Sequence, residues 1–399
     1  MMRITSDNDS NEQLLYFTSS SLDATDGHLV YISDRTGSPN LFTRDLATGI
    51  ARRLTDNREG TLKSYVYFFG SERRGLGKAS VSFDPIRRVL YYIQNDGIRC
   101  VTPDGVGRVL ARVPSGQVTA FTHVSADGRL LCVPTTDERA LDTGNQSGCV
   151  CDRPDYDIDE RMRREGLSSC LNIYDTRTGR LLAAEKVPLA WITHVQFNPV
   201  DPSLILYNHE WPADCGVRRL WLWDGKRHLR LRREGGPRSR DDWTCHEMWQ
   251  PDGGHVIYHG KYKNGSPYIG RVSARGGGPV EIPLPEKYRR YGHFTVGNRN
   301  DNWLVTDGYY HPMGMPENEK QSGEWICRLC VDWKARKIGW HPLCEHLSTW
   351  DCQDSHPHPI FNHTDTAVYF TSDKDGRRAI FRVDVDARRI RNNPLSREK

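Results

Sequence analysis

The chain has 399 residues, of which 37% are hydrophobic and 27% charged, and this composition excludes a largely disordered protein. Its 55 basic and 51 acidic residues leave a net charge of +4, so no general electrostatic field favours nucleic acid, although local basic loops could hold an anionic substrate. No stretch approaches the roughly 18 apolar residues of a membrane span, and the N-terminal sequence MMRITSDNDSNEQLLYF lacks a signal-peptide pattern. We therefore expect an intracellular, cytoplasmic protein that binds neither nucleic acid nor a membrane.

Seven segments of the chain share one pattern. Each has a short apolar strand, a turn rich in Asp, Asn, Pro and Gly, a stronger strand, a loop, and a third strand that ends in a charged turn. In chain order they begin near Gly27, Val81, His123, His194, Met248, His293 and His358. Repeats of three or four antiparallel strands, spaced about 40 to 70 residues apart, are typical of a β-propeller.

The sequence therefore predicts an all-β fold, a seven-bladed β-propeller formed by residues 1–399 as a single domain. A linear β-solenoid is the main alternative, but its repeats are shorter and more uniform; a two-domain β-sandwich is the other. Insertions at about residues 137–169 and 310–323 interrupt the third and sixth units. Each is either a tolerated surface insertion or a rim or lid over a site.

Eleven cysteines at irregular spacing, several within strand-like runs, indicate buried reduced thiols and not a disulfide framework. Cys327 and Cys330 form a C-x-x-C pair, with Cys344 and Cys352 following. Residues three apart on a strand point to opposite faces, which disfavours a structural zinc site at this pair.

The last unit begins with an unusual sequence, QDSHPHPIF, at residues 353–361. Residues i and i+2 of an extended strand face the same side, so His356 and His358 present their imidazoles together, with Gln353 arriving from the loop before them. The intervening prolines are tolerated at the start of a strand and stiffen the backbone. The histidines could be a pair of metal ligands, or they could line the channel and bind water.

Histidines also begin other units: His194 in THVQFNP, His246 in TCHEMWQPDG and His293 in YGHFTVG. Equivalent positions in different blades of a propeller converge on the central axis. Histidines that are far apart in the sequence can therefore meet there.

The segments TCHEMWQPDG, RRYGHFTVG, LCEHLSTWDCQDSHPHPIF and AVYFTSDKDGRRAIF resemble the oligogalacturonate lyases, seven-bladed propeller enzymes of pectin breakdown. The resemblance covers roughly residues 193–385, and its specific part is the Q-x-x-H-x-H segment. It implies a manganese ion held by His293, Gln353, His356 and His358. Imidazole nitrogens with an amide oxygen suit a divalent metal but do not by themselves separate manganese from iron, nickel or zinc.

The reaction that this resemblance implies is β-elimination at a uronate of a short oligouronide such as digalacturonate or its unsaturated form. A base removes the C5 proton, while a cation stabilises the charge that develops on the C6 carboxylate. The resemblance assigns the base to His246 and the arginine on the carboxylate to Arg219 of CGVRRLWLWD. Arg218 would face the opposite side of the strand, so an error of one residue in register would exchange the two.

Other functions are compatible with parts of the sequence. The generic blades also resemble TolB-like propellers, which would make the protein a non-catalytic module that binds a glycan or a protein through its rims. A related lyase acting on a different oligouronide, or another metal-dependent reaction on a sugar acid, would use the same ligands. A peptidase-type propeller ranks last, because there is no G-x-S-x-G segment. The oligomeric state is not encoded in any of these patterns.

Overall fold

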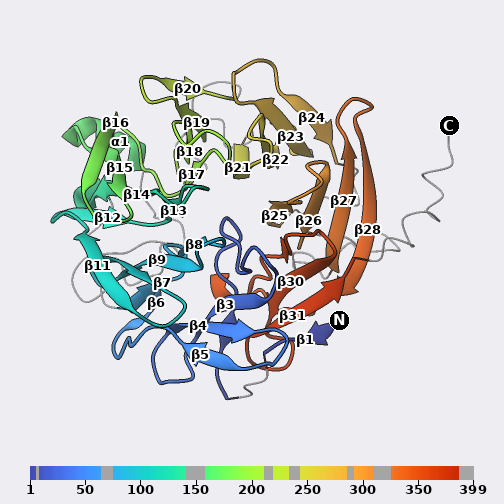
Figure 1. Cartoon of the computed structure of the whole chain (residues 1–399). Coiled ribbons are helices and arrows are strands. Elements are labelled where there is room, and N and C mark those ends of the chain that lie inside the picture. Colours follow the sequence, from blue (N-terminus) through green and yellow to red (C-terminus); the bar gives the residue numbers. More distant parts are fainter. Residues whose placement is uncertain are drawn as a thin grey trace.

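Seven sheets surround a central axis in the computed structural model, each sheet forming one blade (Figure 1). The structure describes residues 1–5, 9–63, 75–140, 158–210, 219–232, 243–284, 292–308 and 325–385. Almost all neighbouring strands are antiparallel; the parallel pair formed by β6 and β7 in the second blade is the exception within these ranges. The predicted seven-bladed β-propeller is confirmed.

The blades follow one another in chain order. The first contains β2 (Glu12–Gln13), β3 (His28–Ser33), β4 (Asn40–Asp45) and β5 (Ala51–Arg53). The second contains β6 (Thr61–Lys63), β7 (Gly75–Gly77), β8 (Ser82–Asp84), β9 (Val89–Gln94), β10 (Gly97–Val101) and β11 (Gly107–Arg112). The third contains β12 (Gln117–Thr119), β13 (His123–Val124), β14 (Leu130–Asp137), β15 (Ser168–Asp175) and β16 (Leu181–Pro188), with η2 (Glu138–Ala140) and α1 (Ile158–Glu165) between β14 and β15.

The other four blades have four strands each. The fourth contains β17 (Val195–Phe197), β18 (Ile205–Asn208), β19 (Leu220–Trp223) and β20 (His228–Arg230). The fifth contains β21 (Trp243–Trp249), β22 (His255–Lys261), β23 (Pro267–Ser273) and β24 (Val280–Pro283). The sixth contains β25 (Phe294–Val296), β26 (Trp303–Thr306), β27 (Trp325–Asp332) and β28 (Lys337–Glu345). The seventh contains β29 (Ile360–Phe361), β30 (Ala367–Ser372), β31 (Ala379–Asp384) and β1 (Met2–Arg3), with η5 (Gln353–Ser355) before β29.

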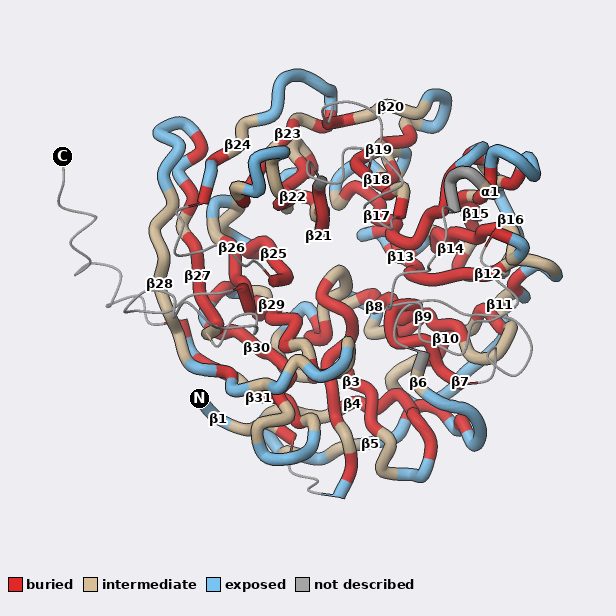
Figure 2. Tube along the Cα trace, turned by 180° about the vertical axis from the view of Figure 1, so that it is seen from behind, coloured by how far each residue is buried: buried red, intermediate tan, exposed pale blue. Residues whose placement is uncertain are grey.

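Strands in the middle of a blade are buried on both faces because neighbouring blades stack against each other. β30, with the sequence AVYFTS, is buried along its whole length, whereas β11, at an outer edge, is exposed or half-buried (Figure 2). Side chains of the first two blades form one continuous apolar cluster that includes Val30, Ile32 and Phe83. Such clusters between blades fix the position of each inner strand, and therefore of the residues that precede it.

The ring closes through its last blade, which combines both ends of the described chain. β1 pairs antiparallel with β31, so that Met2 lies opposite Arg382 and Arg3 opposite Phe381. The Ile4 N–H then donates to the Ile380 carbonyl at 2.8 Å, and the Ile380 N–H donates to Thr5 Oγ1 at 3.0 Å. The N-terminal strand thus completes the sheet of the seventh blade (Figure 1).

The segment between β2 and β3 enters the middle of the ring (Figure 1). Its Tyr16 and Phe17 are 2% exposed and belong to a central apolar cluster with Phe121 of the third blade. The ring centroids of Tyr16 and Phe121 lie 4.6 Å apart, edge to face. An aromatic plug therefore fills part of the channel.

The two predicted insertions are only partly described. Of the first, residues 141–157 lie outside the described residues, while Ile158–Glu165 form α1, whose Met162 is buried in the central cluster. The second, residues 310–323, lies wholly outside them.

Cys327 is buried and Cys330 half-buried on β27, in keeping with opposite faces of a strand. Among the described residues, no helix has the length and apolar character needed to cross a bilayer.

Candidate metal centre and active site

Three histidines from two blades meet at the channel. His293 precedes β25, and His356 and His358 lie between η5 and β29. One ring nitrogen from each lies within 4.8 Å of those of the other two. His293 Nε2 and His358 Nε2 are 3.2 Å apart. The structure thus brings together three of the four ligands that were predicted from the sequence.

Asp307, at the end of β26, organises this cluster. Its carboxylate accepts the His293 N–H at 2.6 Å and the His358 N–H at 3.1 Å. The same carboxylate lies 3.0 Å from His293 Nδ1. Since a carboxylate can only accept here, Nδ1 carries the proton and Nε2 presents its lone pair to the cluster, the arrangement found behind metal-binding histidines.

The charge state of the cluster also suits a cation. Burial, and after it the neighbouring His293, lowers the pKa of His356 to about 3 and holds the pKa of His358 well below its ordinary value. Both rings are therefore neutral at pH 7, the form that binds metal. His356 Nδ1 is buried and has no hydrogen-bond partner among the described residues. The residues present therefore fit a divalent metal ion.

Gln353, the fourth predicted ligand, begins η5 three residues before His356 and is half-buried. Its role as a ligand stays a prediction. The next residue, Asp354, lies 3.4 Å from the Lys78 ammonium, whose side chain is 1% exposed. Burial lowers the pKa of Lys78 although Asp354 opposes the shift. This buried cation beside the cluster was not predicted, because nothing local distinguishes it in the sequence GLGKAS.

His246 lies on β21 at a β-bulge. β21 pairs Cys245 with His259 and Met248 with Ile257, so His246 and Glu247 together face one residue of β22. His246 has φ 53°, a left-handed conformation that non-glycine residues adopt at a cost and that is frequent at functional sites. Its ring lies 4.5 Å from that of His293, centroid to centroid. The predicted base thus lies beside the predicted metal ligands.

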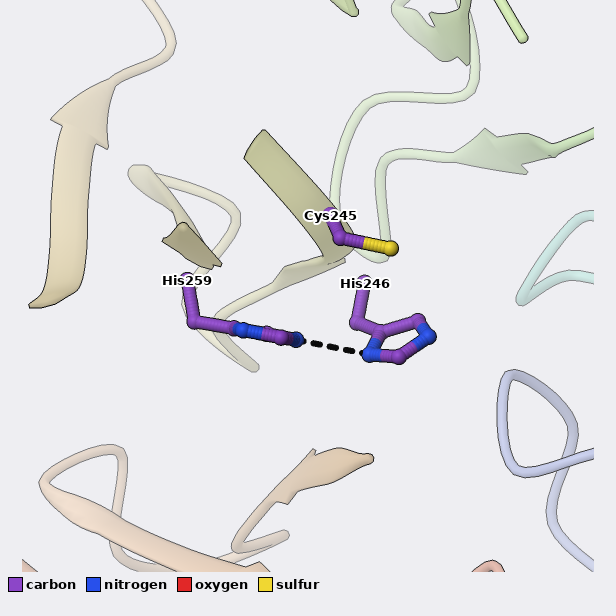
Figure 3. Close-up of side chains that lie close together, drawn as sticks. All are labelled: Cys245, His246 and His259. Atoms are coloured by element: carbon purple, nitrogen blue, oxygen red, sulfur yellow. Dashed lines mark hydrogen bonds between the residues drawn. The ribbon is translucent and has the colours of Figure 1, made fainter. Parts of the chain in front are cut away.

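Two groups hold the Nδ1 atom of His246. It lies 2.7 Å from His259 Nε2 (Figure 3). It also lies 3.2 Å from the Gly292 carbonyl oxygen. A side chain at Gly292 would collide with Asp307, since a Cβ there would lie 1.9 Å from Asp307 Oδ1. Burial, His293 and His259, in that order, hold the pKa of His246 well below its ordinary value. His246 is therefore a neutral imidazole in this structure.

Cys245, His246 and His259 form a second group with ligand atoms within 4.8 Å of one another. Its chemistry is poorer for a metal. The two imidazoles are close enough to share a proton, and burial raises the pKa of the Cys245 thiol to about 12, so the thiolate is not available at neutral pH.

Arg219 precedes β19 and is 3% exposed. Its Nε donates to Glu247 at 2.7 Å and its Nη1 donates to Glu210 at 3.0 Å. Although burial alone would raise it, Arg219 and His194 hold the pKa of Glu210 well below its ordinary range. The guanidinium that is predicted to bind the substrate carboxylate thus already bonds two buried carboxylates of the protein. Arg218, the alternative, lies outside the described residues.

Aromatic rings of the N-terminal plug form one wall of the site. Tyr16 lies 4.9 Å from the ring of His358, and Phe17 lies 5.2 Å from His293 and 5.4 Å from His246, centroid to centroid. Burial raises the pKa of Tyr16 well above its ordinary value, so its hydroxyl keeps its proton. Nothing in the sequence marks these two residues, because they lie between strands of a generic blade.

The partners of the blade-start histidines follow a rule that the sequence could have revealed. Asp307 follows His293 by 14 positions and accepts its N–H at 2.6 Å; Asn208 follows His194 by 14 positions and accepts its N–H at 2.8 Å. The repeat places both acceptors at the end of the second strand of the blade, opposite the blade-start residue. Aligning the repeats would therefore have identified Asp307.

The fold and the cluster define a seven-bladed propeller with a candidate metal centre in its channel. The sequence model of the family described as oligogalacturonate lyase matches residues 169–388. The chain belongs to the oligogalacturonate lyase family.

Individual relatives agree with this membership. The oligogalacturonide lyase of Pectobacterium atrosepticum is 27% identical over 208 residues, which are 49% of this chain and 50% of that protein, so the match spans about half of each. A solved oligogalacturonate lyase in complex with manganese aligns with 97% of this chain and 93% of its own, with a TM-score of 0.74 at 20% identity. The oligogalacturonate lyase of Vibrio parahaemolyticus gives the same coverage and TM-score at 22% identity. These two structures show the same fold.

Proposed function

We propose that the protein is a lyase that cleaves short oligogalacturonides, such as digalacturonate or its unsaturated form, by β-elimination. The observation that carries the proposal is the cluster of His293, His356 and His358, backed by Asp307, in a chain of this family. Manganese is the proposed metal, since a related structure holds it, with Gln353 as the fourth ligand.

His246 is the proposed base. Its Nε2 takes the proton from C5 of the uronate, and the electron pair of the C–H bond is delocalised onto the C6 carboxylate. The C4–C5 double bond then forms as the C4–oxygen bond breaks; the leaving oxygen takes up a proton from solvent, and the protonated His246 returns its own proton to solvent. A bound divalent metal supplies positive charge next to the carboxylate on which negative charge develops.

Arg219 is the proposed second partner of the C6 carboxylate, because a guanidinium matches a carboxylate in two-point geometry. It is already bonded to the carboxylates of Glu210 and Glu247, whose two formal negative charges exceed its single positive charge. The proposal therefore requires that a substrate carboxylate share or displace one of these contacts.

The first test is the rate of unsaturated uronate formation from digalacturonate, measured by ultraviolet absorbance, with chelator-treated protein before and after manganese is restored. Activity that is lost on chelation and returns with manganese would support the proposal. No product in either state would exclude digalacturonate as the substrate. A panel of oligouronides that differ in sugar and linkage would then decide whether a related lyase activity is present.

Two variants separate the proposed roles. His358→Ala should lose both bound manganese and turnover, because a ligand is removed. His246→Ala should keep its manganese and lose turnover by about 100-fold or more, since general-base catalysis is removed. Metal content by elemental analysis and initial rates measure the two effects. Full activity of His246→Ala would refute its assignment as the base.

A further inference from the structure

The hydrogen bonds at His246 determine which of its nitrogens can act as a base. The Gly292 carbonyl, 3.2 Å from Nδ1, can only accept a hydrogen bond. The proton of the neutral ring therefore resides on Nδ1. His259 Nε2, at 2.7 Å from the same atom, must then be the acceptor in the stronger of the two contacts.

The other nitrogen of His246, Nε2, lies on the side of the ring away from His259 (Figure 3). It carries the lone pair once Nδ1 is protonated. The ring packs against His293 at 4.5 Å and edge to face against Phe17 at 5.4 Å, so it stands among the residues of the channel. The orientation that the two acceptors impose is therefore the one that a base facing the channel needs.

The repeat supports a positioning role for His259 independently. In the fourth and sixth blades, the acceptor opposite the blade-start residue holds a histidine: Asn208 holds His194, and Asp307 holds His293. His259 occupies the corresponding position of the fifth blade, opposite Cys245. The bulge of β21 inserts His246 after Cys245, which brings its ring within reach of His259.

Packing fixes His259 itself. His259 is 1% exposed, and its ring lies 5.0 Å from that of Phe294, centroid to centroid. An acceptor that is held by buried neighbours can fix a second ring, as a carboxylate fixes the histidine of a hydrolase triad. Unlike a carboxylate, a neutral imidazole does this without adding a negative charge beside an anionic substrate.

We propose that His259 is a positioning residue that holds His246 as the Nδ1–H tautomer, so that the Nε2 lone pair is presented to the substrate. The inference rests on the proposed function, in which His246 removes the C5 proton. When Nε2 takes this proton, the Nδ1 proton stays in place and is donated to His259 and Gly292. No other group need gain or lose a proton at this pair.

The test compares two substitutions at one position. His259→Phe keeps the ring that packs on Phe294 but removes the acceptor, whereas His259→Gln places a side-chain oxygen near the former Nε2. His259→Phe is expected to lower kcat on digalacturonate by about 10- to 100-fold with KM and bound manganese unchanged. His259→Gln is expected to recover most of the loss. His255→Gln, on the same strand and half-buried, is the control and should keep the wild-type rate.

A spectroscopic measurement decides the same point without turnover. In protein with 15N-labelled histidine, the His246 signals, assigned with His246→Ala, should show a protonated Nδ1 and an unprotonated Nε2. His259→Phe should shift this pattern toward a mixture of tautomers, and His259→Gln should restore it. If the wild-type protein shows no lyase activity, the proposed function fails while this measurement still tests the positioning role.

Several results would overturn the inference. Wild-type kcat for His259→Phe, or an unchanged tautomer pattern in it, would show that Gly292 alone positions His246. Equal loss in the Phe and Gln variants would show that His259 acts through packing. A second equivalent of manganese that is lost in His259→Phe would make Cys245, His246 and His259 a metal site.

Discussion

At the scale of single residues, the site depends on acceptors that fix histidine rings. Asp307 is the strongest case, because one carboxylate accepts from the backbone and the ring of His293 and from the backbone of His358. It joins the two blades that supply the proposed metal ligands. Mutation of the hydrogen-bond partners of metal ligands typically lowers metal affinity or activity by about 10- to 100-fold.

Asp307→Asn should lower manganese affinity by about 10- to 100-fold, because an amide has only one oxygen: it cannot accept the His293 N–H at the Oδ1 position and also His293 Nδ1 and the His358 N–H at the Oδ2 position. Titration calorimetry of the metal-free protein with manganese measures this. Asp365→Asn is a matched control, since Asp365 is also buried and accepts the N–H groups of Asn298 and Asn300 in a turn that contains no proposed ligand. Unchanged affinity in Asp307→Asn would show that the carboxylate does not support the ligands.

At the scale of elements, buried ion pairs connect neighbouring blades. Arg219, just before β19, bonds Glu247 of β21 and Glu210 of its own blade, and all three are at most 4% exposed. Such a network binds strands firmly, and removal of its single cation leaves two carboxylates without compensation.

Arg219→Met should therefore lower the free energy of unfolding by about 3 to 5 kcal/mol, measured by urea denaturation. Arg112 is the control: its side chain is 69% exposed and bonds Asp96 at 2.8 Å. Arg112→Met should change the free energy of unfolding by less than about 1 kcal/mol. If Arg219→Met retains wild-type stability and instead shows a large rise in KM, its main role is on the substrate.

The strand β1 is the other element with a clear task, because it completes the blade that carries His356 and His358. Removing residues 1–4 deletes its pairing with β31 and should lower the free energy of unfolding by about 2 to 4 kcal/mol, at about 1 kcal/mol for each hydrogen bond. Thr5→Val, which removes one hydrogen bond to the Ile380 N–H, should cost about 1 kcal/mol. Urea denaturation measures both. A truncated protein as stable as the full chain would show that β31 does not need its partner.

At the scale of the whole molecule, half-buried neutral histidines are spread around the ring. Burial lowers the pKa of His123 to about 4, that of His209 to about 4 and that of His356 to about 3. In the unfolded chain each returns to about 6.5. Between these values the unfolded state binds more protons, so stability rises with pH there and falls as the pH is lowered from about 6.5 toward 4.

The metal-free protein should thus lose stability steadily between pH 7 and pH 5, as urea denaturation at several pH values would show. His209→Phe should reduce this slope, because the ring that lies 5.0 Å from Trp221 is kept while its titration is removed. A stability that does not change over this range would contradict the neutral state of these histidines.

The sequence by itself determined the number of blades, and its resemblance to the oligogalacturonate lyases supplied the candidate ligands His293, Gln353, His356 and His358. Each repeat carries its own strand and turn signals, and these local signals survive without knowledge of the fold. The spacing of His356 and His358 and the blade-start positions of His246 and His293 also arise from local geometry, so that they could be selected before the ring was seen.

The tertiary structure alone decided what these residues contact. The two partners of Arg219 are Glu247, 28 positions after it, and Glu210, 9 positions before it. Tyr16 and Phe17 reach the site from the first blade. Lys78 lies beside Asp354, which is 276 positions away in the sequence. Nothing local encodes such pairings, because they form only when the ring closes and directs the inner ends of all blades at one axis. The left-handed bulge that turns His246 toward His259 is equally invisible in the alternation of a strand, since one inserted residue changes the face on which a side chain lies.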